Sequence, residues 1–202
     1  MPSPPPGETD LRALARRFED AERRVRALVA QAPDGDRRGL YIEVLETLIA
    51  LRRADLRGPV INAYRAAFET VRGGDLRDPD DLAASLHLKL DRALQRAAMN
   101  ANAAITKVTA DNVDEMTTAA VVAHTDASGA RWALGAYAAM TTSTLGRQAT
   151  TRGLTDAVGT GGKVIVEATG CDYCESFGGE ATVGADPLPP FHPSCQCVAV
   201  PG

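Results

Sequence analysis

Cysteine is absent from the first 170 residues of this 202-residue chain, and aromatic residues are scarce throughout, at 4%. A core with so few aromatic rings must be built mainly from alanine, leucine and valine. Hydrophobic residues make up 45% of the chain, which is enough for a sizeable core. Because alanine and leucine favour helices, this composition predicts a mainly α fold.

Two further absences limit the class of protein. No apolar run approaches the roughly 18 residues that span a membrane. The first residues, MPSPPPGETD, have neither the basic region nor the apolar stretch of a signal peptide. We therefore expect a soluble protein made in a cytoplasm. A net charge of −4 also argues against a protein whose whole surface binds nucleic acid.

Apolar periodicity predicts helices over most of the chain. Residues 1–8 are proline-rich and are expected to form a disordered arm. Apolar residues then recur at spacings of three and four, as on one face of a helix. The helices are expected at 9–31, 37–56, 59–72, 79–104, 110–125 and 128–157. The region 9–160 is thus predicted to be a helical body of elongated hairpins or a bundle.

The character of the sequence changes after residue 162. KVIVEA is β-branched and reads as a strand, FGGEATV as a turn with a short strand, and CQCVAV as a last strand. The region 161–202 is therefore predicted to be a small β-rich knob. Since a unit of this size rarely supports itself by apolar burial alone, we expect it to carry a covalent or metal staple.

All four cysteines lie in this knob, in a pattern typical of metal sites. Cys171 and Cys174 form a C-x-x-C pair, and His192, Cys195 and Cys197 follow after seventeen residues. Structural zinc takes four nitrogen or sulfur ligands in a tetrahedron. In a reducing compartment, clustered cysteines more often bind metal than form disulfides. The sequence therefore predicts one structural zinc ion, with five candidates for four positions.

Several alternatives remain open at this metal site. Cys171 and Cys174 supply one half, and any two of His192, Cys195 and Cys197 supply the other. In an extended strand, residues two apart point to the same face, so both Cys195 and Cys197 could reach one ion. Two disulfides, or a set of free thiols, are the competing interpretation.

Catalytic residues are not expected. A catalytic zinc would need an open coordination position and a nearby base. Glu167, Glu175 and Glu180 lie near the cysteines in sequence, but acids on a small knob are usually solvated. The loop residues His124, Asp126 and Ser128 are of catalytic types, but a triad normally converges from separate elements. We expect them to cap and turn the chain.

The end of the chain resembles a known family signature. The pattern C-x-Y-C-x-x-x-x-G followed by PPFHPSCQC is similar to the C-terminal signature of phage Mu F-like minor head proteins, the head morphogenesis family of tailed phages. The matching residues are Cys171, Tyr173, Cys174, Gly179, Pro189, Pro190, His192, Pro193, Cys195 and Cys197. The likeness extends back to the segment 144–157.

The sequence differs from this family signature at a few positions. Gly178 stands where the family usually has aspartate, and Ser194 and Gln196 replace the usual asparagine and arginine. Neither departure removes a candidate metal ligand.

The resemblance implies a virion protein that is not an enzyme. Such a protein would be present in few copies inside the head, near the portal, and would act in head assembly or genome delivery after synthesis in the host cytoplasm. Its implied partners are the portal, major capsid or scaffold protein. Contact between arginine-rich helical faces, such as that of Arg16 and Arg17, and packaged DNA is left open, as is self-association. The alternative is a cellular zinc-knuckle adaptor or toxin-system interaction protein with no virion role.

Overall fold

The computed structural model describes residues 8–71, 79–169, 171–193 and 195–202. The predicted mainly helical fold is confirmed, with small antiparallel sheets in addition. The helices are α1 (Glu8–Ala30), α2 (Arg37–Arg52), α3 (Gly58–Glu69), α4 (Asp80–Lys107), α5 (Val113–Ala120), α6 (Leu134–Val158) and α7 (Asp172–Glu175). The strands are β1 (Val122–Thr125), β2 (Arg131–Ala133), β3 (Lys163–Glu167), β4 (Gly179–Thr182) and β5 (Val198–Pro201). None of the described helices is long and apolar enough to cross a membrane.

The chain groups into two compact units. The first takes its described residues from 8–12, 57–86 and 140–202, and the second consists of 13–56 and 87–139. The predicted limits of a helical body at 9–160 and a knob at 161–202 stay a prediction about domain organisation. The predicted disordered arm lies outside the described residues, except for Glu8, which begins α1.

In the second unit, the apolar stripe predicted for the first helix is the buried face of α1. Leu14, Phe18 and Val25 are at most 3% exposed. The opposite face is charged, and its arginines form ion pairs with acidic residues. Arg23 pairs with Asp20 on the same helix, and Arg24 reaches Glu43 on α2 at 3.0 Å. Because these arginines have acidic neighbours, this face carries mixed charge.

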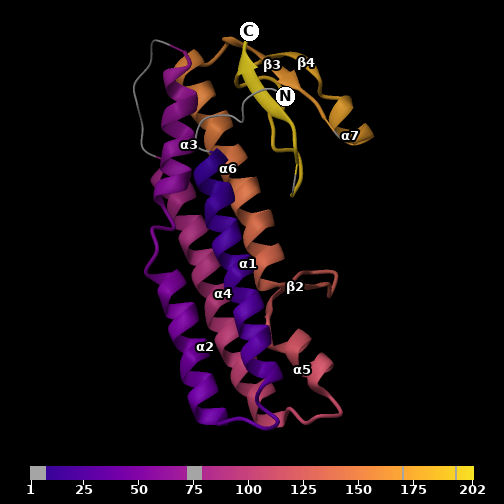
Figure 1. Ribbon diagram of the computed structural model, residues 1–202. Helices are drawn as coiled ribbons and strands as arrows, with labels where there is room; N and C mark the ends of the chain where they lie inside the picture. The colour runs from indigo at the N-terminus through magenta and orange to yellow at the C-terminus, as the bar shows by residue number, and fades with distance from the viewer. Residues whose placement is uncertain (1–7, 72–78, 170, 194) are drawn as a thin grey trace. The chain divides into compact units, whose positions relative to one another are not determined.

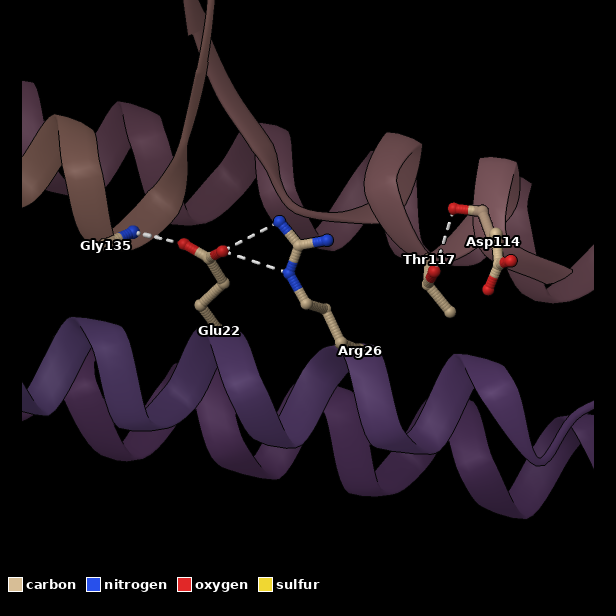
Figure 2. Close-up of polar contacts among 5 residues, drawn as sticks. All are labelled: Glu22, Arg26, Asp114, Thr117 and Gly135. Atoms are coloured by element: carbon tan, nitrogen blue, oxygen red, sulfur yellow. Dashed lines mark hydrogen bonds and ion pairs between the residues drawn. The ribbon is translucent and has the colours of Figure 1, made fainter.

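The start of α6 is held by a carboxylate from α1 (Figure 2). Glu22 accepts a hydrogen bond from the backbone N–H of Gly135 at 2.7 Å and two from the guanidinium of Arg26, at 2.8 and 3.0 Å. The first N–H groups of a helix have no partner within the helix and carry partial positive charge. Glu22 therefore caps α6 from a neighbouring helix. A Cβ on residue 135 would lie 3.0 Å from the Glu19 Cα, so glycine permits this close approach.

The prediction of helices at 110–125 and 128–157 was wrong where the two helices were expected to meet. Helix α5 ends at Ala120, and α6 begins only at Leu134. An antiparallel hairpin of β1 and β2 lies between them, with Val122 paired to Ala133 and Thr125 to Arg131. Valine at 121 and 122 and the Gly129 turn, at φ 86°, favour the hairpin.

Asp126 organises the turn of this hairpin, in the cap-and-turn role expected for it. Its carboxylate accepts hydrogen bonds from the Ser128 hydroxyl at 2.6 Å, the Trp132 indole N–H at 3.0 Å and the backbone N–H of Ala130 at 3.0 Å. The hydrogen bonds from Ser128 and Trp132 lower the pKa of Asp126 to about 2. His124 stacks on Tyr137 instead, with ring centroids 4.6 Å apart.

We predict that Asp126→Asn loosens this hairpin at neutral pH and not in acid. The folded pKa is depressed, so the stabilisation is fully present above the unfolded value of about 3.9 and is lost as the pH falls toward 2. Urea unfolding at a series of pH values, followed by tryptophan fluorescence, measures this. Wild type should be the more stable at pH 7, and the difference should shrink below pH 4. A difference that is independent of pH would contradict the assignment.

In the first unit, glycines allow α6 to pack closely on its neighbours. A Cβ at Gly153 would lie 2.2 Å from the backbone carbonyl oxygen of Tyr64 on α3. A Cβ at Gly146 would meet the end of the Leu11 side chain at 2.3 Å. Close to Gly153, the Tyr64 hydroxyl donates to the Asp156 carboxylate at 2.9 Å. Helices α3 and α6 are therefore in backbone contact.

The three C-terminal strands form one antiparallel sheet in the order β4-β3-β5 (Figure 1). The strands predicted from KVIVEA and FGGEATV are confirmed, with Val164 paired to Ala181 and to Pro201. Alternate residues of β3 are buried, as expected for a sheet with one covered face. The covered face packs on α6 in one apolar cluster, which consists of Leu154, Val164, Val166, Ala181, Val183 and Ala199.

We predict that Gly153→Ala destabilises the protein by about 1–3 kcal/mol, because the new methyl group meets backbone that cannot move aside. Gly146→Ala is the matched control in the same helix. Its methyl group meets a movable leucine tip, and alanine favours the helix by about 0.8–1 kcal/mol over glycine. Urea unfolding monitored by circular dichroism compares the two. Equal stability of both variants would contradict the proposed close contact of α3 and α6.

Candidate metal centre

The C-x-x-C pair lies on α7, a single helical turn. Cys171 is the N-cap residue, with an extended backbone at φ −160° and ψ 148°. Its sulfur accepts a hydrogen bond from the backbone N–H of Cys174 at 3.4 Å. Cys174 is fully buried, whereas Cys171 is half-buried. This turn brings both sulfurs to one side of the backbone, as required for two ligands of one ion.

His192 presents one ring nitrogen to these sulfurs. Its Nε2 lies 3.4 Å from the Cys171 Sγ and 3.0 Å from the Cys174 Sγ. Its Nδ1 lies 2.8 Å from the carbonyl oxygen of Pro193. A carbonyl can only accept, so Nδ1 carries a proton, and in the neutral form of the ring the lone pair of Nε2 is directed at the sulfurs. Histidines that bind metals are commonly oriented by such a backbone carbonyl.

Cys195 and Cys197 complete the cluster and are both fully buried. The Cys195 Sγ lies 3.8 Å from the Cys174 Sγ, and the Cys197 Sγ accepts the backbone N–H of Thr169 at 3.4 Å. The strand predicted over CQCVAV is shorter than expected, because β5 begins only at Val198. The argument from alternation along a strand therefore does not apply to Cys195 and Cys197, although both approach Cys174.

The ligand-type atoms form two overlapping groups. Cys171, Cys174 and His192 make one, and Cys174, Cys195 and Cys197 make the other, with all ligand atoms of a group within 4.8 Å of one another. Cys174 belongs to both groups. The structure therefore brings all five candidate residues together and provides clusters that could hold a metal ion.

The spacing of the sulfurs fits a metal better than a disulfide. A tetrahedron with metal–sulfur bonds of about 2.3 Å has sulfurs about 3.8 Å apart, which matches the 3.8 Å between Cys174 and Cys195. Bonded sulfurs would be about 2.05 Å apart. All four cysteines of the chain are free thiols. The donor set of thiols and one imidazole is that of structural zinc sites.

The surroundings shift the pKa values of the thiols in different directions. Burial, together with the neighbouring sulfurs, raises the pKa of Cys174 well above its ordinary value. For Cys195, burial acts in the same direction, but hydrogen bonds with the backbone at Phe191 and Cys197 lower the pKa to about 7. The hydrogen bond to Cys174 lowers the pKa of Cys171, and that to Pro193 raises the pKa of His192. Because ligands bind metal as thiolates, loading would release protons.

Carboxylates take no part in the two ligand groups of the described chain. Glu180 pairs with Lys163 at 2.8 Å, and Glu167 and Glu175 are exposed. Sequence reasoning missed two contributors to the site, the N–H of Thr169 and the carbonyl of Pro193. Both are backbone groups and not side chains. Because backbone groups of this kind recur all along the chain, the sequence gives no signal that these two contribute to the site.

Comparisons with protein-family models, with curated proteins and with solved structures found no match for this chain. The fold and the cysteine cluster are therefore the observations from which a function can be argued. The resemblance to the head morphogenesis signature stays a prediction.

We predict that Cys174→Ser strongly weakens metal binding, because Cys174 is common to both groups and without it only two separate pairs of ligand-type residues remain. Ser176→Ala is the matched control, because this residue is the C-cap of α7 and its hydroxyl bonds only the Tyr173 carbonyl among the described contacts. Titration with Co²⁺ under reducing conditions, followed by sulfur-to-cobalt absorption, measures binding. Wild type and Ser176→Ala should show the band. A wild-type band in Cys174→Ser would contradict the central position of this thiol.

Proposed function

We propose that the chain is a structural minor head protein of a tailed phage and that one zinc ion fastens its C-terminal segment. The observation that carries the proposal is the convergence of Cys171, Cys174, His192, Cys195 and Cys197. These are the ligand-type residues of the signature that the sequence resembles. Their meeting in space gives that signature a physical reason, namely a shared metal.

Zinc is the metal that this donor set favours. Thiolate ligands select zinc, copper(I) or iron–sulfur clusters, whereas magnesium and calcium take oxygen ligands. One imidazole among cysteines is a common structural zinc combination. With five donors available for four positions, protein ligands alone complete the tetrahedron. Cys174 is one ligand, and three of the remaining four residues supply the others.

The site is proposed to stabilise and not to catalyse. A catalytic zinc keeps a position for water and has a general base beside it. Here the donors outnumber the positions, and the nearby Glu180 is paired with Lys163. The ion would instead join α7 to the segment before β5, which lie about twenty residues apart in the sequence. The binding energy of the metal would then be folding energy of this segment.

The helices are proposed to supply contacts with other head proteins. Portal, major capsid and scaffold proteins are the partners implied by the signature. A cellular zinc-knuckle adaptor would carry the same site and differs only in location. The two are therefore separated by asking where the protein resides.

We predict that the protein co-purifies with heads of the phage that encodes it and is protected inside them. Intact heads treated with protease should retain the full-length chain in mass spectrometry, whereas the free protein is digested. A phage in which the gene encodes Cys174→Ser should yield fewer filled heads, and one with Ser176→Ala should yield the normal number. If heads lack the protein while infected or uninfected cells contain it free, the adaptor function is supported and the virion function fails.

A further inference from the structure

Three aromatic side chains form a surface beside the metal centre. Tyr173 and Phe177 meet edge to face, with centroids 5.3 Å apart, and Phe177 stacks on Phe191 at 4.6 Å. We call these three residues the aromatic patch. They are three of the nine aromatic residues of the chain. Tyr173 is 60% exposed and is the one aromatic among the large exposed hydrophobic residues of the described chain.

The aromatic patch packs on the sheet core and on the buried cysteines. Phe191 packs against both the sheet core and the cluster of buried cysteines, and Phe177 stacks on it. Tyr173 lies on α7 between Cys171 and Cys174, so the metal-site residues fix its backbone on both sides. A ring that is already ordered loses little conformational entropy when a partner binds. Such rings are preferred anchors of protein interfaces.

Acidic residues outnumber basic ones in the segment that carries the patch. Residues 163–202 contain five acidic residues and one lysine, whereas residues 1–162 contain 21 acidic and 21 basic residues. The single lysine, Lys163, pairs with Glu180. Asp172 and Glu175 flank Tyr173 on the same helical turn and are exposed. The net charge of the whole chain is therefore concentrated in the segment that carries the patch.

We propose that the aromatic patch docks a basic peptide segment of another protein. An arginine or lysine of that segment would lie over the exposed face of Tyr173 in a cation–π contact. Further basic groups of the same segment would face the carboxylates of Asp172 and Glu175. Charge complementarity identifies this occupant. The inference does not depend on a virion role, because it uses only contacts and charges of this segment.

Two other occupants fit the charges less well. Nucleic acid would bring phosphates against the exposed carboxylates of Asp172 and Glu175. A second copy of the chain would offer its arginine-rich helix α1, but the arginines there have acidic partners, as in the pairs Arg23–Asp20 and Arg24–Glu43. With six arginines and five acidic residues, helix α1 has a net charge of only +1, so a segment with a larger excess of basic residues is expected from a different protein.

The test is a binding titration of the full-length protein, with its metal, against a fluorescent twelve-residue peptide in which arginine and lysine alternate with glycine and serine. Anisotropy should rise on binding, and the affinity should fall as salt screens the charges. Tyr173→Ala should weaken binding about twofold to fivefold, as expected for an exposed cation–π contact. Tyr173→Phe keeps the ring face and should bind as wild type. The double variant Asp172→Asn, Glu175→Gln should also weaken binding.

Controls separate docking from damage to the fold. Ile165→Ala removes another exposed apolar side chain of the same unit, at 42% exposure, and should leave binding unchanged. The Co²⁺ band of each variant shows that the metal centre is intact. Equal binding by Tyr173→Ala, or equal binding of a peptide with glutamate in place of the basic residues, would overturn the proposal. The proposal would also be overturned if the peptide does not bind and Tyr173 is instead required for binding a single-stranded oligonucleotide, or for self-association detected by sedimentation.

Discussion

The convergence of four sulfurs and one imidazole is the contact on which α7 and the approach to β5 depend. The residues come from α7, from the turn around His192 and from the approach to β5, and the first two of these also meet through the stacking of Phe177 on Phe191. Cys174, Cys195 and Cys197 are fully buried together, with a Cys174–Cys195 distance of 3.8 Å. Buried thiols without a metal would be weak packing groups. A shared ion turns the same atoms into a staple that fixes three pieces of chain.

The rest of the segment has a separate source of stability. The inner face of the β4-β3-β5 sheet packs on Leu154 of α6 in one apolar cluster, while the cysteines form a second cluster beside it. Phe191 contacts both clusters and thus connects sheet packing to the metal centre. The knob is therefore better supplied with apolar contacts than its small size suggested. The proposed ion would chiefly fix α7 and the residues His192, Cys195 and Cys197, which lie beside the aromatic patch.

Sequence patterns predicted the helices and strands that are determined by the periodicity of their own side chains. The stripe of Leu14, Phe18 and Val25 predicted α1, and the β-branched run at 163–167 predicted β3, because side-chain periodicity follows burial. The hairpin at 122–133 was missed, since its strands are short and its stability comes from Asp126 bonding Trp132 across the turn. The site residues were all named in advance because ligand chemistry restricts residue type. The order in which they meet, with Cys174 shared by both groups, depends on tertiary contacts that spacing alone does not specify.

The proposed head protein would thus combine helices that pack closely through glycines with a metal-fixed terminal surface of negative charge. The central claim is that one zinc ion joins these thiols, and zinc X-ray absorption of the full-length protein, purified under reducing conditions, tests it most directly. The account predicts about one zinc per chain, surrounded by sulfurs at about 2.3 Å and by imidazole nitrogen. Protein that contains no zinc, and whose four thiols all react at once with a thiol reagent in the folded state, would contradict it.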